Sequence, residues 1–249
     1  MQDKVVLITG GSRGIGAATA RLAASYGWRV CLNYRKNREV AENLVEEIIR
    51  TGGNAFAVAA DISKENDVER LFDAVIKQYG RLDALVNNAG IIDRQSKLVE
   101  MSAERLQRMF DTNILGSFIC ARQAIKLMSV KQQGTGGGIV NLSSAAARLG
   151  SPGEFIDYAA SKGAIDTMTI GLSKEVAEDG VRVNAVRPGL IDTEIHQDAG
   201  DARRPEKLRH AIPMKRSGSA REVANTIMWL LSDEASYITG ALVDVSGGR

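Results

Sequence analysis

Cysteine and histidine are scarce in this sequence of 249 residues, which holds two of each. Cys31 and Cys120 lie inside the apolar runs "VCL" and "FICA". A cysteine in such a run is usually a small buried hydrophobic residue, so neither a disulfide nor a ligand role is favoured. His196 and His210 have no cysteine or acidic cluster around them at ligand spacing, and the sequence therefore predicts no metal site.

A large excess of charge of one sign is also missing. The 32 Lys and Arg residues face 30 Asp and Glu residues, the formal net charge is +2, and no long basic run occurs, which argues against nucleic acid as the main partner. No apolar run approaches the ~18 residues of a spanning helix, so no membrane partner is expected. The start, "MQDKVVLITGG", lacks the pattern of a signal peptide, and we expect a cytoplasmic protein.

What the sequence does contain is a regular alternation of short apolar runs and longer segments of helical period. The runs are apolar almost throughout, as in strands that are covered on both faces, and lie at 4–9, 29–34, 54–60, 82–87, 138–143, 181–186 and 241–245. The helical segments lie at about 14–26, 38–51, 63–80, 102–130, 155–178 and 220–232. In the third of these, Ser63 is the expected N-cap and Gly80 the expected end.

Strands that alternate with helices predict an α/β fold, a doubly wound parallel sheet of about seven strands with helices on both faces. No Pro/Ser-rich linker divides the chain, so residues 1–249 are predicted to form a single domain. The segment at about 190–214 departs from the pattern, because it is polar, weakly periodic and broken by Pro205 and Pro213. Such a stretch in a compact domain is typically a lid or a binding loop, here a substrate loop.

A glycine-rich turn, "TGGSRGIG" at 9–16, follows the first predicted strand and opens the first predicted helix. Its glycines let the backbone turn sharply and approach a ligand closely. The helix behind them offers unpaired N–H groups and a positive dipole end to a pyrophosphate. The turn therefore predicts a dinucleotide site made by Gly10, Ser12, Arg13, Gly14, Ile15 and Gly16. A Walker-type loop is excluded, because no Lys-Ser/Thr pair follows the last glycine.

The end of the second predicted strand, "LNYRKN", indicates which dinucleotide is bound. NAD-binding sites usually carry Asp or Glu here to hold the ribose hydroxyls, whereas this chain has Asn33, Tyr34 and Arg35. A carboxylate would repel a 2′-phosphate, and a guanidinium can grip it with two hydrogen bonds. With Arg13 as a second cation, the sequence favours NADPH/NADP over NADH.

The stretch "YAASK" at 158–162 places a tyrosine and a lysine four positions apart, on one face of a predicted helix. Carbonyl reduction needs a proton donor, and a nearby cation lowers the pKa of a tyrosine from about 10. Tyr158 and Lys162 are thus a candidate proton donor and its tuner. The small residues between them also suit a helix packing face, and the pair alone does not decide between these interpretations.

Several motifs follow one another in a fixed order over essentially the whole chain: "TGGSRGIG", Asp61 after the third strand, "NNAG" at 87–90, Asn113 in "DTNILG", "SS" at 143–144, "YAASK", and "RPGLIDT" at 187–193. The ordered set resembles the short-chain dehydrogenase/reductase family in its compact branch, which implies a Rossmann-like sheet. Within the family it is most similar to bacterial 3-oxoacyl-carrier-protein reductases and glucose dehydrogenases.

The resemblance implies roles for further residues. Asp61 would contact the adenine, the segment 88–90 would line its ribose, and "PGLIDT" would wrap the nicotinamide end. Cofactor contacts are accordingly expected from Asn33, Tyr34, Arg35, Asp61, Ile62, Asn88, Ala89, Gly90, Tyr158, Lys162, Pro188, Gly189, Ile191 and Thr193. The family's catalytic tetrad maps to Asn113, Ser144, Tyr158 and Lys162. Ser144 would hold the substrate oxygen and Asn113 a water molecule beside Lys162. A homo-tetramer or dimer through the helices at 102–130 and 155–178 is also implied.

The sequence leaves several alternatives open. Ser144 precedes Tyr158 by 14 positions, slightly more than is common in the family, so Ser143 is a second candidate for the working hydroxyl. The leading prediction is an NADPH-dependent oxidoreductase that interconverts a carbonyl and an alcohol; a dinucleotide sensor or scaffold without turnover is the alternative. Candidate substrates are a 3-oxoacyl thioester, a sugar or another small polar carbonyl. Enoyl reductases of this family usually place the tyrosine and lysine six apart, which argues against that reaction.

Overall fold

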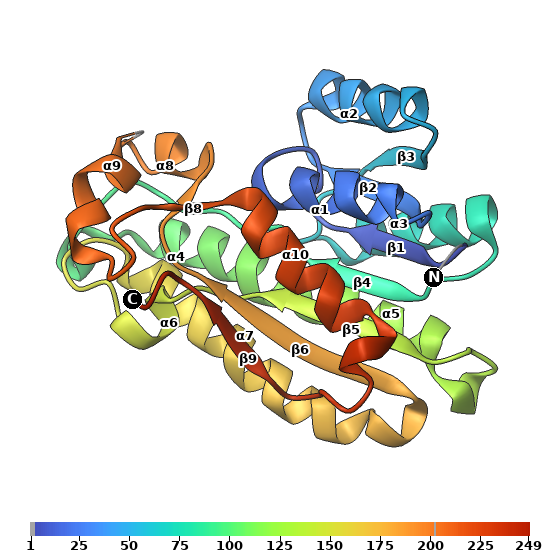
Figure 1. Ribbon diagram of the computed structural model, residues 1–249. Coiled ribbons are helices and arrows are strands. Elements are labelled where there is room, and N and C mark those ends of the chain that lie inside the picture. Colours follow the sequence, from blue (N-terminus) through green and yellow to red (C-terminus); the bar gives the residue numbers. More distant parts are fainter. Residues whose placement is uncertain (1–2, 202) are drawn as a thin grey trace.

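The computed structural model describes residues 3–201 and 203–249, and in these seven strands form one parallel sheet (Figure 1). The sheet order is β3-β2-β1-β4-β5-β6-β9, so the chain starts in the middle, winds to one edge and returns to wind to the other. The strands are β1 (Val5–Ile8), β2 (Arg29–Tyr34), β3 (Asn54–Ala59), β4 (Ala84–Asn87), β5 (Gly137–Leu142), β6 (Val181–Pro188) and β9 (Leu242–Val245). The predicted α/β class and its seven strands are confirmed.

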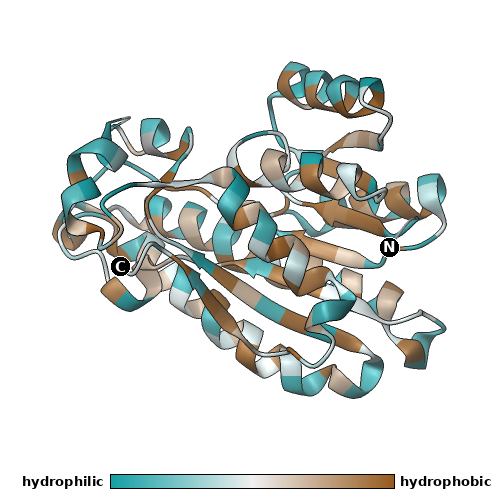
Figure 2. Ribbon diagram, in the orientation of Figure 1, coloured by the Kyte–Doolittle hydropathy of each residue, from teal (hydrophilic) through white to brown (hydrophobic). Residues whose placement is uncertain are grey.

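Helices cover both faces of the sheet, as the sequence predicts. One layer holds α1 (Gly14–Ser25), α2 (Arg38–Arg50) and α10 (Ala220–Leu231); the other holds α3 (Glu65–Tyr79), α4 (Ala103–Phe110), α5 (Gly116–Met128) and α7 (Ile156–Glu175). Strand β1 explains the continuous apolar runs, because Val6 and Ile8 pack into the first layer and Val5 and Leu7 into the second. Figure 2 shows the same central strands as a hydrophobic interior.

The sequence predictions need two corrections at the helix ends. The predicted helix at 102–130 is interrupted, because η2 (Asp111–Leu115) is a π-helix between α4 and α5. Ser63 is not the N-cap of α3; Lys64 holds that position, and the Ser63 hydroxyl instead donates to Asp61 Oδ1 at 2.7 Å. The predicted end of α3 is confirmed, since Gly80 caps it in the left-handed region with φ of 76°.

Short elements complete the chain. They are α6 (Ala146–Leu149) and the 3-10 turns η1 (Leu98–Glu100), η3 (Val130–Gln132), η4 (Ala177–Asp179) and η6 (Asp233–Ala235). Both cysteines are buried and unpaired, as expected, and burial raises the pKa of each thiol. Among the described residues, no helix is long and apolar enough to cross a membrane, and no group of three or more His, Cys, Asp or Glu could hold a metal ion.

The predicted loop at 190–214 is partly structured. It begins with β7 (Ile191–Asp192), which pairs with β8 (Gly218–Ser219), and continues through α8 (Ile195–Asp198), α9 (Arg204–Leu208) and η5 (Arg209–Ala211). We call residues 193–212 the lid segment. In Figure 1 α8 and α9 lie together at the end of the sheet where β4, β5 and β6 terminate, so the lid segment stands where open parallel sheets bind their ligands.

Candidate active site

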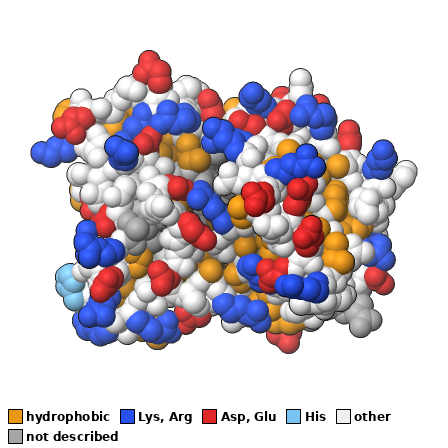
Figure 3. All heavy atoms as spheres, turned by 90° about the horizontal axis from the view of Figure 1, so that it is seen from above, with side chains coloured by type: hydrophobic (Ala, Val, Ile, Leu, Met, Phe, Trp, Pro, Cys, Tyr) orange, Lys and Arg blue, Asp and Glu red, His pale blue; other side chains and the backbone are white. Residues whose placement is uncertain are grey.

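A cavity of about 670 Å³ lies at the carboxyl ends of the strands. Of the described residues, it is lined by every site residue predicted from the sequence except Gly16 and Asn113. Basic and acidic side chains are interspersed on the face seen in Figure 3. The cavity therefore gathers residues that are spread from position 10 to position 193 of the chain, which is the arrangement a long two-ended ligand requires.

The glycine loop forms one wall of the cavity. Gly10 and Gly14 have φ of 58° and 53°, a region that favours glycine. A Cβ atom on Gly10 would also lie 2.9 Å from the Cα atom of Ala89. Gly16 lies behind the loop, where Asn88 Nδ2 donates to the carbonyls of Thr9 and Gly10 at 2.9 Å. The loop is thus locked to the end of β4, and the first turn of α1 contains no acidic residue of its own.

One end of the cavity is built at the tips of β2 and β3. Asn33 is buried, accepts the Gly10 amide at 3.2 Å and donates to the Ala60 carbonyl at 3.0 Å, so it fixes the loop. Asp61 accepts the Ser63 amide and hydroxyl. Arg35 lines the cavity, and among the described residues its guanidinium has no ion-pair partner. Arg13, by contrast, pairs with Asp198 of the lid segment.

A further wall of the cavity is formed at the end of β6. Segment 188–193 leaves β6 and crosses the cavity mouth, with Pro188, Gly189, Ile191 and Thr193 in its lining. The Thr193 methyl would lie 3.4 Å from a Cβ atom on Gly14, so the two segments approach each other closely. The residues present therefore fit a dinucleotide that is extended from the tip of β2 to the tip of β6.

Three polar side chains converge at the inner end of the cavity. Tyr158 and Lys162 stand one turn apart on α7, and Lys162 Nζ lies 5.5 Å from the centroid of the Tyr158 ring. Lys162 Nζ donates to the Leu142 carbonyl at the end of β5, at 2.7 Å. The Ser144 hydroxyl hydrogen-bonds the Tyr158 side chain. Ser143 is buried and donates to the Lys162 carbonyl at 3.2 Å, so the structure places Ser144 and not Ser143 beside the tyrosine.

Asn113 lies in the π-helix η2 behind these groups. Its Oδ1 accepts the Ile91 amide at 2.8 Å, and its Nδ2 donates to the Ile91 carbonyl at 2.9 Å and to Ser161 Oγ at 3.1 Å. A Cβ atom on Gly90 would lie 3.4 Å from Asn113 Oδ1 and 3.5 Å from Lys162 Nζ. Asn113 thus meets Lys162 next to Gly90, but its amide is already engaged by protein groups.

Burial shapes the titration of both groups on α7. It raises the pKa of Tyr158, and the hydrogen bond from Ser144 opposes this rise. Burial also lowers the pKa of Lys162 to about 8, against the attraction of the Asp166 carboxylate. The sequence predicts that the cation lowers the pKa of the tyrosine; in the structure desolvation is the larger effect, because it disfavours the charged form of each group.

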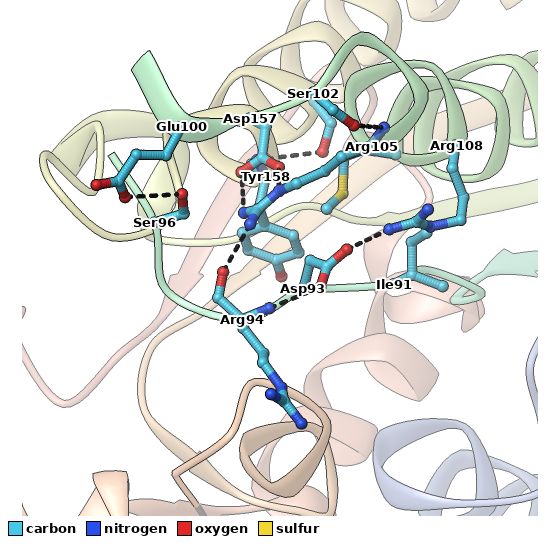
Figure 4. Close-up of polar contacts among 12 residues, drawn as sticks. Ile91, Asp93, Arg94, Ser96, Glu100, Ser102, Arg105, Arg108, Asp157 and Tyr158 are labelled. Carbon is cyan, nitrogen blue, oxygen red and sulfur yellow. Dashed lines mark hydrogen bonds and ion pairs between the residues drawn. The ribbon is translucent and has the colours of Figure 1, made fainter. Parts of the chain in front are cut away.

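Two buried ion pairs flank the Tyr158–Lys162 turn, and neither was predicted from the sequence. Arg105 Nε of α4 donates to Asp157 Oδ2 at 2.8 Å, and Arg187 Nη2 of β6 donates to Asp166 Oδ2 at 2.8 Å. Figure 4 shows the first pair directly behind Tyr158. The available signal was two acidic residues on the inward face of an otherwise small and apolar helix, since a buried acid requires a partner.

Comparison with known proteins agrees with this geometry. A family model described as "Enoyl-(Acyl carrier protein) reductase" matches residues 10–249. An uncharacterized oxidoreductase of Escherichia coli, YgfF, is 53% identical over 98% of this chain and 99% of its own length. A 3-oxoacyl-[acyl-carrier-protein] reductase of Synechocystis is 40% identical over 98% of this chain and 96% of its own length.

Solved structures match equally well. A 3-ketoacyl-(acyl-carrier-protein) reductase from Brucella melitensis, complexed with NADH, superimposes with a TM-score of 0.92 at 34% identity and covers 100% of this chain and 98% of its own. A short-chain dehydrogenase from Burkholderia cenocepacia in complex with NADP gives 0.90 at 32% identity, over 99% and 98% of the two chains. The chain belongs to the short-chain dehydrogenase/reductase family and is an oxidoreductase.

Proposed function

We propose that this protein is an NADPH-dependent oxidoreductase that reduces a carbonyl to an alcohol, or runs the reverse reaction. The observation that carries the proposal is the meeting of Ser144, Tyr158 and Lys162 at one end of a cavity whose other end is the glycine loop. When bound, the nicotinamide would supply the hydride, which goes to the carbonyl carbon. The protein must then supply a proton to the carbonyl oxygen.

In the proposed mechanism Tyr158 supplies this proton, and Ser144 helps to hold the substrate oxygen. Both hydroxyls donate hydrogen bonds to the substrate oxygen, and the Tyr158 O–H bond breaks as its proton moves to that oxygen. The charged Lys162 stabilises the phenolate that remains, because an opposite charge within a few ångströms favours the ionised form. In the alcohol-to-ketone direction the phenolate takes the proton back. Asn113 contributes by holding the backbone at Ile91, beside Gly90 and Lys162.

The preference for NADPH rests on Arg35. Its guanidinium lines the adenine end of the cavity and pairs with no described acid, and Asn33 and Tyr34 bring no carboxylate to that end. Arg13 is engaged by Asp198, so Arg35 is the cation more readily available to a 2′-phosphate. Membership of the family does not decide the cofactor, because the Brucella reductase was solved with NADH and the Burkholderia dehydrogenase with NADP.

A 3-oxoacyl thioester is the substrate class that we favour. The cavity beyond Tyr158 is walled by Ile92, Leu149, Phe155 and Leu190, which suit an acyl chain better than a sugar. Arg204 lines this wall but is paired with Glu154, Nη1 to Oε1 at 3.0 Å, and packs over the Phe155 ring. The Synechocystis and Brucella relatives are named as reductases of such substrates. The spacing of Tyr158 and Lys162 by a single helical turn argues against enoyl reduction.

The experiment is NADPH consumption across a panel of 3-oxoacyl thioesters, enoyl thioesters, ketones and sugars. Turnover of the 3-oxoacyl thioesters should fall about 100-fold or more in Tyr158→Phe, because the proton donor is lost. Tyr26→Phe, the same change at an exposed tyrosine, is the matched control. Undiminished turnover in Tyr158→Phe would contradict the mechanism, and NADPH binding without any turnover would support the alternative, a dinucleotide sensor.

We also propose a homo-tetramer or dimer built on α5 and α7. Phe118 on α5 and Ile156 and Ile170 on α7 are 48%, 39% and 41% exposed. Gly163 lies seven positions from each of these isoleucines and so on their face of α7, and nothing stands within 4 Å of a Cβ atom built on Gly163 or Gly171. Apolar side chains beside glycines leave room for a second helix to approach closely, as at helix–helix contacts between subunits.

A further inference from the structure

The buried ion pair between Arg105 and Asp157 stands immediately behind the proposed proton donor. The Asp157 side chain has no exposed surface and the Arg105 side chain is only 12% exposed. Arg105 Nε donates to Asp157 Oδ2 at 2.8 Å and Nη2 to Oδ1 at 3.3 Å. This two-point contact fixes the plane of the guanidinium against the carboxylate, which a single point charge would not do.

Asp157 connects the pair to Tyr158 itself. Its Oδ1 accepts the backbone amide of Tyr158 at 2.9 Å, and both residues lie in the first turn of α7. The first amides of a helix have no partner within the helix, so a side-chain acceptor here determines how the first turn begins. The direction of the Tyr158 side chain follows from the placement of that turn.

Arg105 also holds the opposite wall of the cavity. Its Nη1 donates to the Arg94 carbonyl at 2.8 Å, in the segment 91–97 that follows β4. Ile91, Ile92 and Asp93 of this segment line the cavity. Figure 4 shows Arg105 between the Arg94 carbonyl on one side and Asp157 on the other. One guanidinium therefore joins α4, the start of α7 and the wall that faces Tyr158.

We propose that Arg105 is a positioning residue for the proposed reaction, which acts through Asp157 to set the place of the Tyr158 hydroxyl relative to the cavity wall at 91–93. Arg105 does not line the cavity. A displacement of about 1 Å at a proton donor is enough to lower a rate roughly 100-fold. The proposal rests on the function proposed above, and it assigns to α4 a task beyond packing.

The test separates positioning from stability. Arg105→Met leaves the Asp157 carboxylate buried without its cation, so both kcat and the melting temperature should fall, kcat by about 10- to 100-fold. The double variant Arg105→Met/Asp157→Leu replaces the pair by apolar groups, which restores stability in other buried pairs. It should regain the melting temperature but not kcat, because the acceptor for the Tyr158 amide is gone. Arg105→Lys keeps the positive charge but cannot make the two-point contact, so its kcat should lie between those of the wild type and Arg105→Met.

A readout that needs no turnover accompanies the kinetics. With 3-fluorotyrosine in place of the five tyrosines, the ¹⁹F resonance of Tyr158, assigned by Tyr158→Phe, reports the surroundings of that ring. It should move in Arg105→Met and in the double variant, whereas the dissociation constant for NADPH should change less than about 3-fold. Arg21→Met, which breaks an exposed two-point pair between Arg21 of α1 and Glu47 of α2, is the control and should alter none of these quantities.

Two outcomes would overturn the proposal. One is a double variant that regains kcat together with its melting temperature, since the pair would then be a stabilising contact only. The other is a Tyr158 resonance that stays in place in Arg105→Met. If the wild type turns over no carbonyl at all, the proposed function fails, and the fluorine resonance still decides whether Arg105 positions Tyr158.

Discussion

At the scale of single residues, the proposed preference for NADPH rests on Arg35. Arg35→Asp replaces a guanidinium at the cavity lining by a carboxylate, which would repel a 2′-phosphate and bind ribose hydroxyls. We expect the KM for NADPH to rise about 10- to 100-fold, since charge-assisted hydrogen bonds are lost, and the KM for NADH to fall. Steady-state kinetics with both dinucleotides measure this. Arg50→Asp, at the exposed end of α2, is the control; an unchanged KM for NADPH in Arg35→Asp would refute the assignment.

The lowered pKa of Lys162 predicts how the rate of the proposed reaction depends on pH. A lysine is charged below its pKa, which burial lowers to about 8 here, and the proposed reduction needs the charged form. The value of kcat/KM should therefore be level below pH 8 and decline above it. Asp166→Asn removes the carboxylate that raises this pKa and leaves Arg187 unpaired beside it, so the decline should begin at lower pH. A decline that stays in place or moves upward, measured against an exposed control, Asp233→Asn, would contradict this account.

Some residues of the candidate site can be predicted from the sequence and others cannot, for a physical reason. Tyr158, Lys162 and the glycines belong to short local patterns whose chemistry follows from spacing, and they were predicted. Ser144 could not be distinguished from Ser143, because the two differ only in where each hydroxyl points after β5. Arg105 and Asp157 are 52 positions apart, and no local pattern joins them.

At the scale of elements, the glycine loop shows what close backbone approach requires. Gly10→Ala adds a methyl 2.9 Å from the Cα atom of Ala89, at a residue with φ of 58°. The loop must shift, at about 1 to 2 kcal/mol for the left-handed conformation alone, so the dissociation constant for NADPH should rise about 10-fold. Fluorescence titration measures it. Gly52→Ala, at a glycine that is also left-handed but has no atom within 4 Å of the new methyl, should bind NADPH as the wild type does; equal losses in both variants would refute the explanation.

The periodicity of apolar residues locates the long helices and strands but not the short or irregular ones. Continuous apolar runs located all seven strands of the main sheet, because strands buried on both faces leave that signal. Strands β7 and β8 are two residues long, too short for any pattern. The π-helix η2 follows a 3.6-residue pattern closely enough to pass for α-helix, although its extra residue per turn places Asn113 against Ile91.

At the scale of the whole molecule, the exposed faces of α5 and α7 predict assembly. Ile170→Glu places a charge in the proposed contact, and burying it there is costly. We expect the oligomer to dissociate, which sedimentation velocity would show as a loss of mass. Ile49→Glu is the matched control, since Ile49 is 55% exposed on α2, outside the contact. An unchanged mass in Ile170→Glu, or equal dissociation of both variants, would place the interface elsewhere.

The lid segment links the two ends of the cavity. Asp198 pairs with Arg13 of the glycine loop, and Arg204 pairs with Glu154 just before α7, so one stretch of chain is fastened at both the cofactor side and the substrate side. Whatever opens it for one ligand also loosens the enclosure of the other. In the proposed reaction, the alcohol and the spent dinucleotide would therefore leave past the same stretch of chain, which two ion pairs hold in place.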